Sequence, residues 1–337
     1  MDGNDGGALL IDVGGTHTRL AVCNGPNGNI FPQGIKIYES RVYPGIDKII
    51  QNYRSSLGIL PKAVVIGVAG PVTEDSAGAT NLTWTINAKK LKTAIGFSEV
   101  RIINDVEALG YAIEVLGEND IEIIHSGKRC LRSPAALIAP GTGLGESFLV
   151  PSENGFQVFP SEGGHADFAP TNAMEIGLLD FLLKRGNHVS YERVCSGPGI
   201  CNIYRYLADK RICFEPSWLK KRIETAEDPA AIIARNALSG TDATAITVRT
   251  VEIFVSILGA EAGNLAMRYG AGGGIYIGGG IAPKIRPFLT RAAFVLSFKA
   301  KGRLSGYVSS IPVMLIRKPE ANLWGLANYA QKTLTTG

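Results

Sequence analysis

The chain has 337 residues, of which 45% are hydrophobic, so it can bury a large core, and its length favours two domains over one. The charged fraction is 19% and the net charge only +4, which excludes the strongly basic surface that nucleic acid or an anionic membrane requires. No apolar run reaches the ~18 residues of a membrane helix, and residues 1–7 lack the basic start of a secretory signal. We therefore expect a cytoplasmic protein whose five scattered cysteines stay reduced.

The chain opens with a predicted β-hairpin that has a glycine-rich tip, Gly14-Gly15-Thr16. The same pattern returns about 130 residues later, around Gly141–Gly145. The apolar runs that flank the two tips are Ala8–Ile11, Leu20–Cys23, Ala135–Ala139 and Phe148–Val150. This repetition indicates two related domains and not a short-period repeat protein.

Strands and helices alternate between and after these hairpins. The predicted strands are Ala63–Val68, Val100–Ile103 and Ile275–Ile277. The predicted helices are one from Ala88 to Gly96 with Asn87 as its cap, one from Val106 to Leu116, one from Asp242 to Arg268, and one from Glu320 to Thr333. This alternation is typical of an α/β fold, and we expect the last helix to return to the first domain.

The first hairpin tip, with Asp12 just before it, has the features of a phosphate site. Its glycines let backbone N–H groups approach a ligand closely, and no Gly-Lys-Ser/Thr follows, so it is not a Walker loop. An ordinary glycine turn is the alternative. Asp12 favours the phosphate interpretation, because a carboxylate beside phosphates needs a bridging cation such as Mg²⁺.

Two further glycine-rich segments can contact a nucleotide. Gly141-Thr142-Gly143-Leu144-Gly145 offers backbone donors and the Thr142 hydroxyl, so that two such loops would hold adjacent phosphates. Gly278-Gly279-Gly280 follows a strand and would let an adenine-ribose unit lie flat against the backbone. Plain tight turns are the alternative for both segments.

Asp105 follows a predicted strand directly, and ligands of α/β sheets bind at the carboxyl ends of strands. A phosphoryl-transfer enzyme needs a carboxylate that accepts the proton of the attacking hydroxyl, and Asp105 is the best-placed candidate. The alternative role is a helix cap, which aspartate often provides.

Polar residues in two later loops are suited to a neutral polyol. Ser161-Glu162-Gly163-Gly164-His165 combines a carboxylate and an imidazole with small residues, and Glu192 precedes a second loop. Sugars are bound by polar groups that pair with each hydroxyl. A structural role for His165 and a plain surface position for Glu192 are the alternatives, and the neighbouring sequence supplies no further metal ligands.

Taken together, these motifs resemble the bacterial-type glucokinases of the actin, hexokinase and heat-shock-70 ATPase superfamily over nearly the whole chain. The segments that carry the resemblance are LLIDVGGTHTRLAV at the first loop, NLTW at 81–84, IINDVEA around Asp105, APGTGLG at the second loop, SEGGHADFAP around Glu162, ERVCSGPGI from Glu192, and GGGIAPK.

The resemblance implies an α/β fold of two ribonuclease-H-like (actin-like ATPase) domains with a cleft between them, a small one of residues 1–116 and 318–337 and a large one of residues 117–317. It implies ATP-dependent phosphorylation of the 6-hydroxyl of glucose by a homodimer that needs Mg²⁺. It also implies that Asp105 is the general base and that Asp12 binds the metal ion. The implied sugar ligands are Asn81, Asn104, Glu162, His165 and Glu192. The implied phosphate-binding residues are Gly14, Gly15, Thr16, Gly141, Thr142 and Gly143, and Gly279 and Gly280 are implied to line the adenosine pocket.

The sequence also departs from related patterns. No cysteine-rich zinc motif follows His165, so we assign no structural metal, and Glu146 stands where related glucokinases commonly have a small or apolar residue. We expect its side chain to face away from the phosphates. A sugar-sensing regulator without activity and an ATPase that needs no sugar are the alternatives; Asp105 argues against the first and the Glu162 loop against the second. Residue types leave the choice among glucose, mannose, fructose and glucosamine open.

Overall fold

The computed structural model describes residues 7–24, 31–57, 61–73, 76–78, 82–240 and 244–334. The chain divides into two compact units. The first comprises Met1–Asp120, Ser152–Pro160 and Lys318–Gly337, and the second comprises Ile121–Pro151 and Ser161–Arg317.

The first unit is built on a five-stranded sheet with the order β3-β2-β1-β4-β8. Its strands are β1 (Ala8–Val13), β2 (His17–Cys23), β3 (Gln33–Glu39), β4 (Ala63–Val68) and β8 (Glu99–Asn104). β1 runs antiparallel to β2 and parallel to β4, which is parallel to β8. The predicted hairpin and both predicted strands of this unit are therefore confirmed. A small sheet adds β5 (Val72–Thr73), β6 (Ser76–Gly78) and β7 (Thr85–Asn87).

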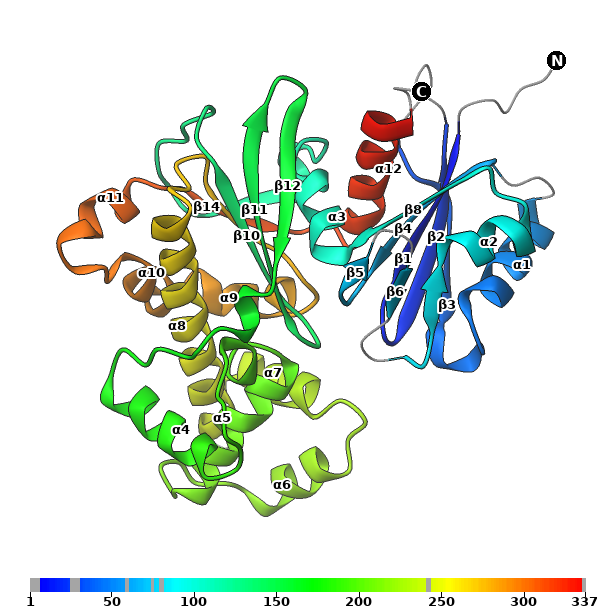
Figure 1. Cartoon of the computed structure of the whole chain (residues 1–337). Coiled ribbons are helices and arrows are strands. Elements are labelled where there is room, and N and C mark those ends of the chain that lie inside the picture. The colour runs from blue at the N-terminus through cyan, green and yellow to red at the C-terminus, as the bar shows by residue number, and fades with distance from the viewer. Residues whose placement is uncertain are drawn as a thin grey trace. The chain divides into compact units, whose positions relative to one another are not determined.

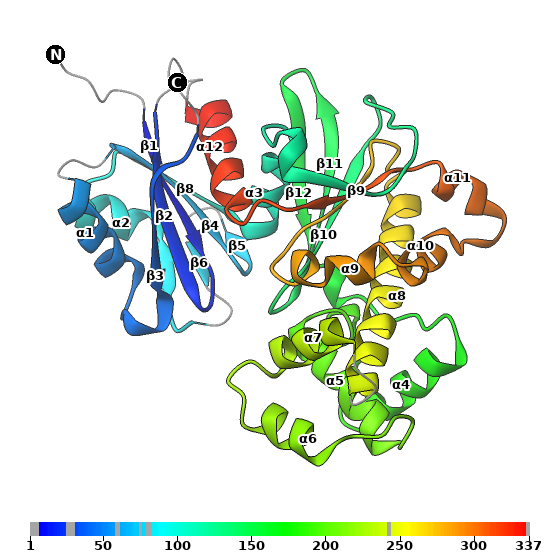
Figure 2. The same cartoon turned by 180° about the vertical axis from the view of Figure 1, so that it is seen from behind.

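Helices cover both faces of the five-stranded sheet, because alternate residues of β1 are apolar and buried on opposite sides. Leu9, Ile11 and Val13 share a core with α1 and α2, whereas Ala8 and Leu10 share one with α12 and α3. These helices are α1 (Ile46–Leu57), α2 (Ala88–Ile95), α3 (Asp105–Ala112) and α12 (Ala321–Leu334). Figures 1 and 2 show α12 beside the sheet face opposite to α1 and α2.

The capping residues predicted for α2 are confirmed. The Asn87 side chain accepts a hydrogen bond from the backbone N–H of Lys90, and Gly96 ends the helix in the left-handed conformation with φ 90°. The predicted helix from Val106 to Leu116 is shorter than expected: α3 ends at Ala112 and a turn follows.

The second unit repeats the pattern of the first around a sheet with the order β12-β11-β10-β13-β14-β9. The strands of this sheet are β9 (Ile121–His125), β10 (Ala135–Pro140), β11 (Leu144–Ser152), β12 (Gly155–Ser161), β13 (Ile275–Ile277) and β14 (Val313–Ile316). Residues 155–160 of β12 belong to the first unit. β10 runs antiparallel to β11 and parallel to β13, as β1 does to β2 and β4. The second predicted hairpin is thus confirmed, and each unit places a glycine-rich tip at the end of an equivalent strand.

Several helices of the second unit pack against α8 (Ala245–Arg268), a 24-residue helix with most side chains buried. The other helices are α4 (Ala173–Leu183), α5 (Gly197–Asp209), α6 (Ser217–Glu224), α7 (Pro229–Ser239), α9 (Arg286–Leu289), α10 (Ala292–Lys299) and α11 (Ser305–Ser309). Short 3-10 helices are η1 (Ser40–Val42), η2 (Glu118–Asp120), η3 (Gly163–His165), η4 (Tyr191–Arg193), η6 (Ala282–Ile285) and η7 (Gly302–Leu304). The predicted start of α8 at Asp242 lies outside the described residues. Within the described ranges, no helix has the length and apolar character needed to cross a membrane.

Candidate active site

The first hairpin tip and Asp105 lie at the same edge of the first sheet. The strand register aligns Val13 of β1 with Val68 of β4, and Val68 with Asn104 of β8. The parallel strands β1, β4 and β8 therefore end together. The turn at 14–16 follows β1, and Asp105 follows β8. Because neighbouring strands are about 4.8 Å apart, β1 and β8 are roughly 10 Å apart at this edge.

Asn104, and not Asp105, is the cap of α3. The Asn104 Oδ1 atom accepts hydrogen bonds from the N–H groups of Val106 at 2.8 Å and Glu107 at 3.4 Å, while its Nδ2 donates to the Gly70 carbonyl at 3.2 Å. Asp105 is the first residue of the helix, is half-buried, and accepts from the Val106 N–H at 3.0 Å. The capping alternative for Asp105 is therefore wrong, and much of the Asn104 amide is already engaged by the protein.

Asp12 is a buried carboxylate that is held from two sides. It is 5% exposed, its Oδ2 pairs with Arg19 Nη1 at 3.0 Å, and its Oδ1 accepts from Asn322 Nδ2 at 3.0 Å. Each carboxylate oxygen has a further lone pair, and Mg²⁺ is usually held by one or two carboxylates together with phosphate oxygens and water. Asp12 therefore fits a nucleotide-bound Mg²⁺, and the described residues contain no cluster of three or more metal-ligating side chains.

Ser40 fixes the shape of the first hairpin tip. Its Oγ donates to the Gly14 carbonyl at 2.7 Å, and its N–H donates to the Thr16 carbonyl at 2.9 Å. A Cβ on Gly14 would lie only 2.8 Å from the His17 carbonyl oxygen, which explains the glycine. Gly15 and Thr16 are partly or fully exposed, so their backbone donors are accessible to a phosphate.

Three loops of the second unit meet around Leu144, at the second hairpin tip. The Glu192 Oε2 atom accepts from the Leu144 N–H at 3.0 Å, and the Gly197 N–H donates to the Gly141 carbonyl at 2.9 Å. Gly164 packs so closely on the Leu144 carbonyl that a Cβ there would overlap it. The second glycine loop, the Glu162 loop and the Glu192 loop therefore form one polar cluster within this unit.

Glu162 and His165 lie next to each other on the surface of this cluster. Their side chains are 73% and 61% exposed, with Glu162 Oε2 and His165 Nε2 4.0 Å apart, so both can reach a ligand. The backbone fixes their loop to the next one, because the Tyr191 N–H donates to the Ala166 carbonyl at 3.0 Å. The structure thus brings Glu162, His165 and Glu192 together, as the predicted sugar site requires.

The triple-glycine segment is adjacent to the second hairpin tip. The Gly278 N–H donates to the Ile138 carbonyl at 2.9 Å, and the Ile281 N–H donates to the Pro140 carbonyl at 3.2 Å. Gly279 has φ 77° and lies against Pro140, whereas a Cβ on Gly280 would meet nothing within 4 Å. Gly279 is therefore required by the backbone, and Gly280 leaves open space for a ligand.

A model of the family described as "Glucokinase" matches residues 9–333, and this match covers nearly the whole chain. The chain belongs to the glucokinase family. A glucokinase of Trichormus variabilis is 37% identical over 337 residues, with 95% of this chain and 97% of that protein covered. The crystal structure of a glucokinase from an Antarctic psychrotroph has a TM-score of 0.81 at 31% identity and covers 97% of this chain and 99% of that one.

The fold is the two-domain actin-like ATPase fold that the resemblance implied. A glucokinase of the repressor, open-reading-frame and kinase family from Streptomyces griseus, solved with glucose and AMPPNP, has a TM-score of 0.65 at 19% identity. It covers 97% of this chain and 100% of its own, which shows a shared fold. The α/β assignment and the recognition of the glucokinase family are both confirmed.

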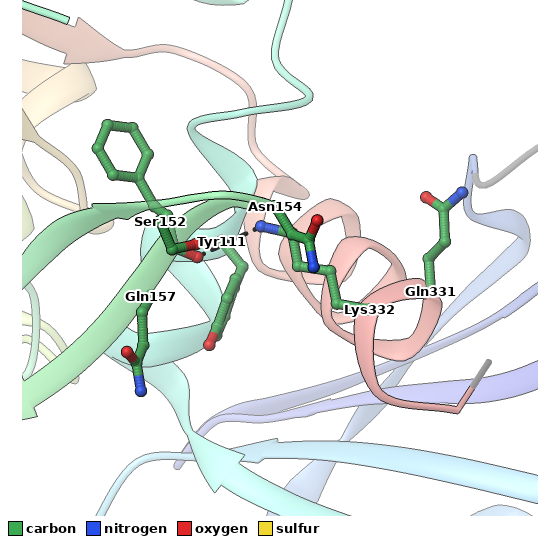
Figure 3. Close-up of a pocket in the computed structure, with 7 residues that line it drawn as sticks. Tyr111, Ser152, Asn154, Gln157, Gln331 and Lys332 are labelled. Carbon is green, nitrogen blue, oxygen red and sulfur yellow. Dashed lines mark hydrogen bonds between the residues drawn. The ribbon is translucent and has the colours of Figure 1, made fainter. Parts of the chain in front are cut away.

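A separate surface pocket of this glucokinase-family chain contains none of the predicted site residues. It has a volume of about 380 Å³ and is lined by Tyr111, Ser152, Asn154, Phe156, Gln157, Gln331 and Lys332. Lys332 Nζ donates to the Phe156 carbonyl at 3.3 Å, and Figure 3 shows Lys332 among the residues that line this pocket. Lys332 also pairs with Glu114 at 2.5 Å, so its charge is already compensated.

Several residues that shape the site have no recognisable signal in the sequence. Arg19, Asn322 and Ser40 act over long sequence separations, and no local pattern indicates their roles. Glu146, a residue unusual for its position after the second glycine loop, is buried in the second unit beside Gly163. Asn81, a predicted sugar ligand, lies outside the described residues.

Proposed function

We propose that this chain is a glucokinase that transfers the γ-phosphoryl group of ATP to the 6-hydroxyl of D-glucose. The observation that carries the proposal is the near full-length family match, combined with a carboxylate and a glycine turn on one sheet edge. The glucose and AMPPNP present in the Streptomyces griseus structure support the choice of substrates.

Asp105 would act as the general base. Its carboxylate takes the proton of the glucose 6-hydroxyl while that oxygen attacks the γ-phosphorus, and the bond from the γ-phosphorus to the β–γ bridging oxygen breaks to release ADP. The carboxylate follows β8, at the edge where β1 and β4 also end, and one of its oxygens is fixed by the Val106 N–H. A fixed carboxylate reduces the orientational freedom lost when the transition state forms.

The remaining glucose hydroxyls would be bound by Glu162, His165 and Glu192, with Asn104 and Asn81 as further ligands. The exposed carboxylate and imidazole at 4.0 Å form an acceptor and donor pair of the kind that recognises a vicinal diol. Glu192 would also couple sugar binding to the second glycine loop, because its carboxylate already accepts from Leu144.

The nucleotide would be bound mainly by backbone groups. We assign the phosphates to Gly14, Gly15 and Thr16 and to Gly141, Thr142 and Gly143, and the adenosine to Gly279 and Gly280. Asp12 would hold Mg²⁺, which when bound neutralises part of the charge on the phosphates. Arg19 and Asn322 orient Asp12 from both sides.

We further propose that residues 1–116 with 318–337 and residues 117–317 are the functional domains of a cytoplasmic homodimer. The two compact units of the chain, whose boundaries lie near these positions, support the assignment of the two domains. The five free cysteines support the cytoplasmic location.

Product analysis tests the proposed function directly. The chain is incubated with MgATP and D-glucose, and the product is identified by ³¹P and ¹H NMR; we expect glucose 6-phosphate. 6-Deoxyglucose is the matched control, because it retains every other hydroxyl. Phosphorylation at another carbon, or of 6-deoxyglucose, would contradict the assignment. Mannose, fructose and glucosamine in the same assay rank the substrates.

A further inference from the structure

Glu146 is a buried carboxyl that the proposed reaction does not use. It lies on β11 opposite Ile138 of β10, is 1% exposed, and neither of its oxygens has a hydrogen-bond partner in the described part of the chain. A buried polar group without a partner costs free energy. Its presence in the core of the second unit therefore requires a physical explanation.

The charged groups around Glu146 are already engaged with one another. Glu261 of α8 is fully buried and accepts from Arg268 Nη1 at 2.7 Å and from Asn264 Nδ2 at 2.8 Å. Lys301 donates to Asn264 Oδ1 at 2.8 Å and to a backbone carbonyl. An ionised Glu146 would thus be a second buried anion beside Glu261, whose charge Arg268 already compensates. Burying this second negative charge without a partner is strongly unfavourable.

The result is that Glu146 is an uncharged carboxylic acid at neutral pH. Burial, with the charge of Glu261 adding to it and that of Arg268 opposing it, raises the pKa of Glu146 to about 8. The neighbouring Tyr191 and Cys195 have pKa values raised mainly by burial, so neither ionises before Glu146.

The other side of the Glu146 carboxyl contacts the predicted sugar loop. A Cβ built on Gly163 would overlap the Glu146 Oε2 atom, so the carboxyl lies directly against the Gly163 backbone. Gly163 stands between Glu162 and His165 in the sequence, and its N–H donates to Ser161 Oγ at 3.0 Å. Any displacement of the Glu146 side chain therefore reaches both predicted sugar ligands through one or two peptide units.

We propose that Glu146 is a positioning residue for glucose: as a neutral acid it supports the backbone of the Ser161–His165 loop, and its ionisation displaces that loop and weakens glucose binding. The inference rests on the proposed function, because it takes Glu162 and His165 as sugar ligands. It adds a residue with no substrate contact to the determinants of affinity, and it predicts a loss of affinity at alkaline pH.

The size of the effect follows from the titration. If only the neutral form of Glu146 supports binding, the apparent affinity scales with its neutral fraction. With a pKa of about 8, the KM for glucose rises about tenfold between pH 7 and pH 9, while kcat at saturating glucose changes much less.

The experiment compares the intact wild-type chain with Glu146→Gln at pH 6 to 9, measuring KM and kcat for glucose and glucose Kd by calorimetry. Glutamine has the same shape and cannot ionise, so we expect its KM to match the wild type at pH 7 within about twofold and to stay flat to pH 9. Glu227→Gln, an exposed glutamate of the same unit, is the matched control and should retain the wild-type rise. Lys301, whose pKa burial lowers, is present in all three proteins, so its titration cancels in the comparison.

Two results would overturn the proposal: a wild-type KM that does not rise between pH 7 and pH 9, or a rise that Glu146→Gln retains in full. The first of these results overturns the proposal even if the variant fails to fold. If the wild type does not phosphorylate glucose at all, the proposed function fails as well; if it does so with coincident profiles, only the role of Glu146 fails.

Discussion

Asp105→Asn separates the proposed catalytic role of Asp105 from its structural one. The variant keeps an Oδ1 acceptor for the Val106 N–H, which Asp105 now binds at 3.0 Å, and Asn104 continues to cap α3. What it loses is one negative charge in the first turn of a helix, worth about 0.3–1 kcal/mol of stability. For a folding unit of this size the melting temperature should fall by no more than about 4 °C.

The expected catalytic loss is much larger. A general base contributes about 10²–10⁴ to the rate, so kcat should fall by at least about 100-fold, or roughly 2.7 kcal/mol in the activation barrier. The KM for glucose should change much less, because the hydroxyl ligands remain. Steady-state kinetics with a coupled ADP assay and differential scanning calorimetry measure the two effects.

Asp47→Asn is the matched control. Asp47 lies in the first turn of α1, so its removal has a comparable electrostatic cost to a helix of the same unit but affects no predicted ligand. We expect a similar change in melting temperature and an unchanged kcat. An Asp105→Asn variant with kcat within about threefold of wild type, or a fall in kcat matched by Asp47→Asn, would refute the assignment of the base.

Three further predictions concern glycine packing and Glu146. Gly163→Ala should raise the KM for glucose at least about tenfold, because the new Cβ overlaps Glu146; an unchanged KM in glucose titrations would show that the loop tolerates the displacement. Gly325→Ala should lower the free energy of unfolding by about 1–3 kcal/mol in denaturant unfolding, because the new Cβ overlaps the Ala108 carbonyl. Gly306→Ala is the control: its new Cβ meets no atom within 4 Å, so the variant should be stabilised by up to about 1 kcal/mol. The folded-state pKa of Glu146 is raised from 4.5 to about 8, so the stability that its protonation contributes is complete below pH 4.5 and lost as the pH rises to 8. The free energy of unfolding of Glu146→Gln relative to wild type, measured by denaturant unfolding, should therefore increase over that window by up to about 4 kcal/mol; a constant difference would mean that Glu146 ionises normally.

Local signals in the sequence predicted the elements that hold the proposed site. The two glycine-tipped hairpins, the strand before Asp105 and the caps at Asn87 and Gly96 each depend on a few neighbouring residues. Short-range sterics and hydrogen bonds decide such features, and the structure confirms them. The length of α3 was harder to predict, since the apolar spacing continues to Leu116 although the helix ends at Ala112.

Contacts between residues far apart in the sequence could not be predicted from local sequence signals. Asn322 binds Asp12 across 310 positions, and Ser40 fixes Gly14 across 26. Periodicity and composition contain no information about such pairs, because they depend on strand order and register. The role of Glu146 could not be predicted either. The sequence shows that the residue is unusual, but only its packing between α8 and Gly163 explains why ionisation of its carboxyl is unfavourable.

The rate of ADP release from ATP, measured with and without glucose, tests the central claim most directly. The account predicts that release requires glucose and that the two are consumed in equal amounts. ADP release at the same rate without sugar would indicate a plain ATPase, and the absence of release with glucose would indicate a sugar-binding protein without activity; either result would contradict the account.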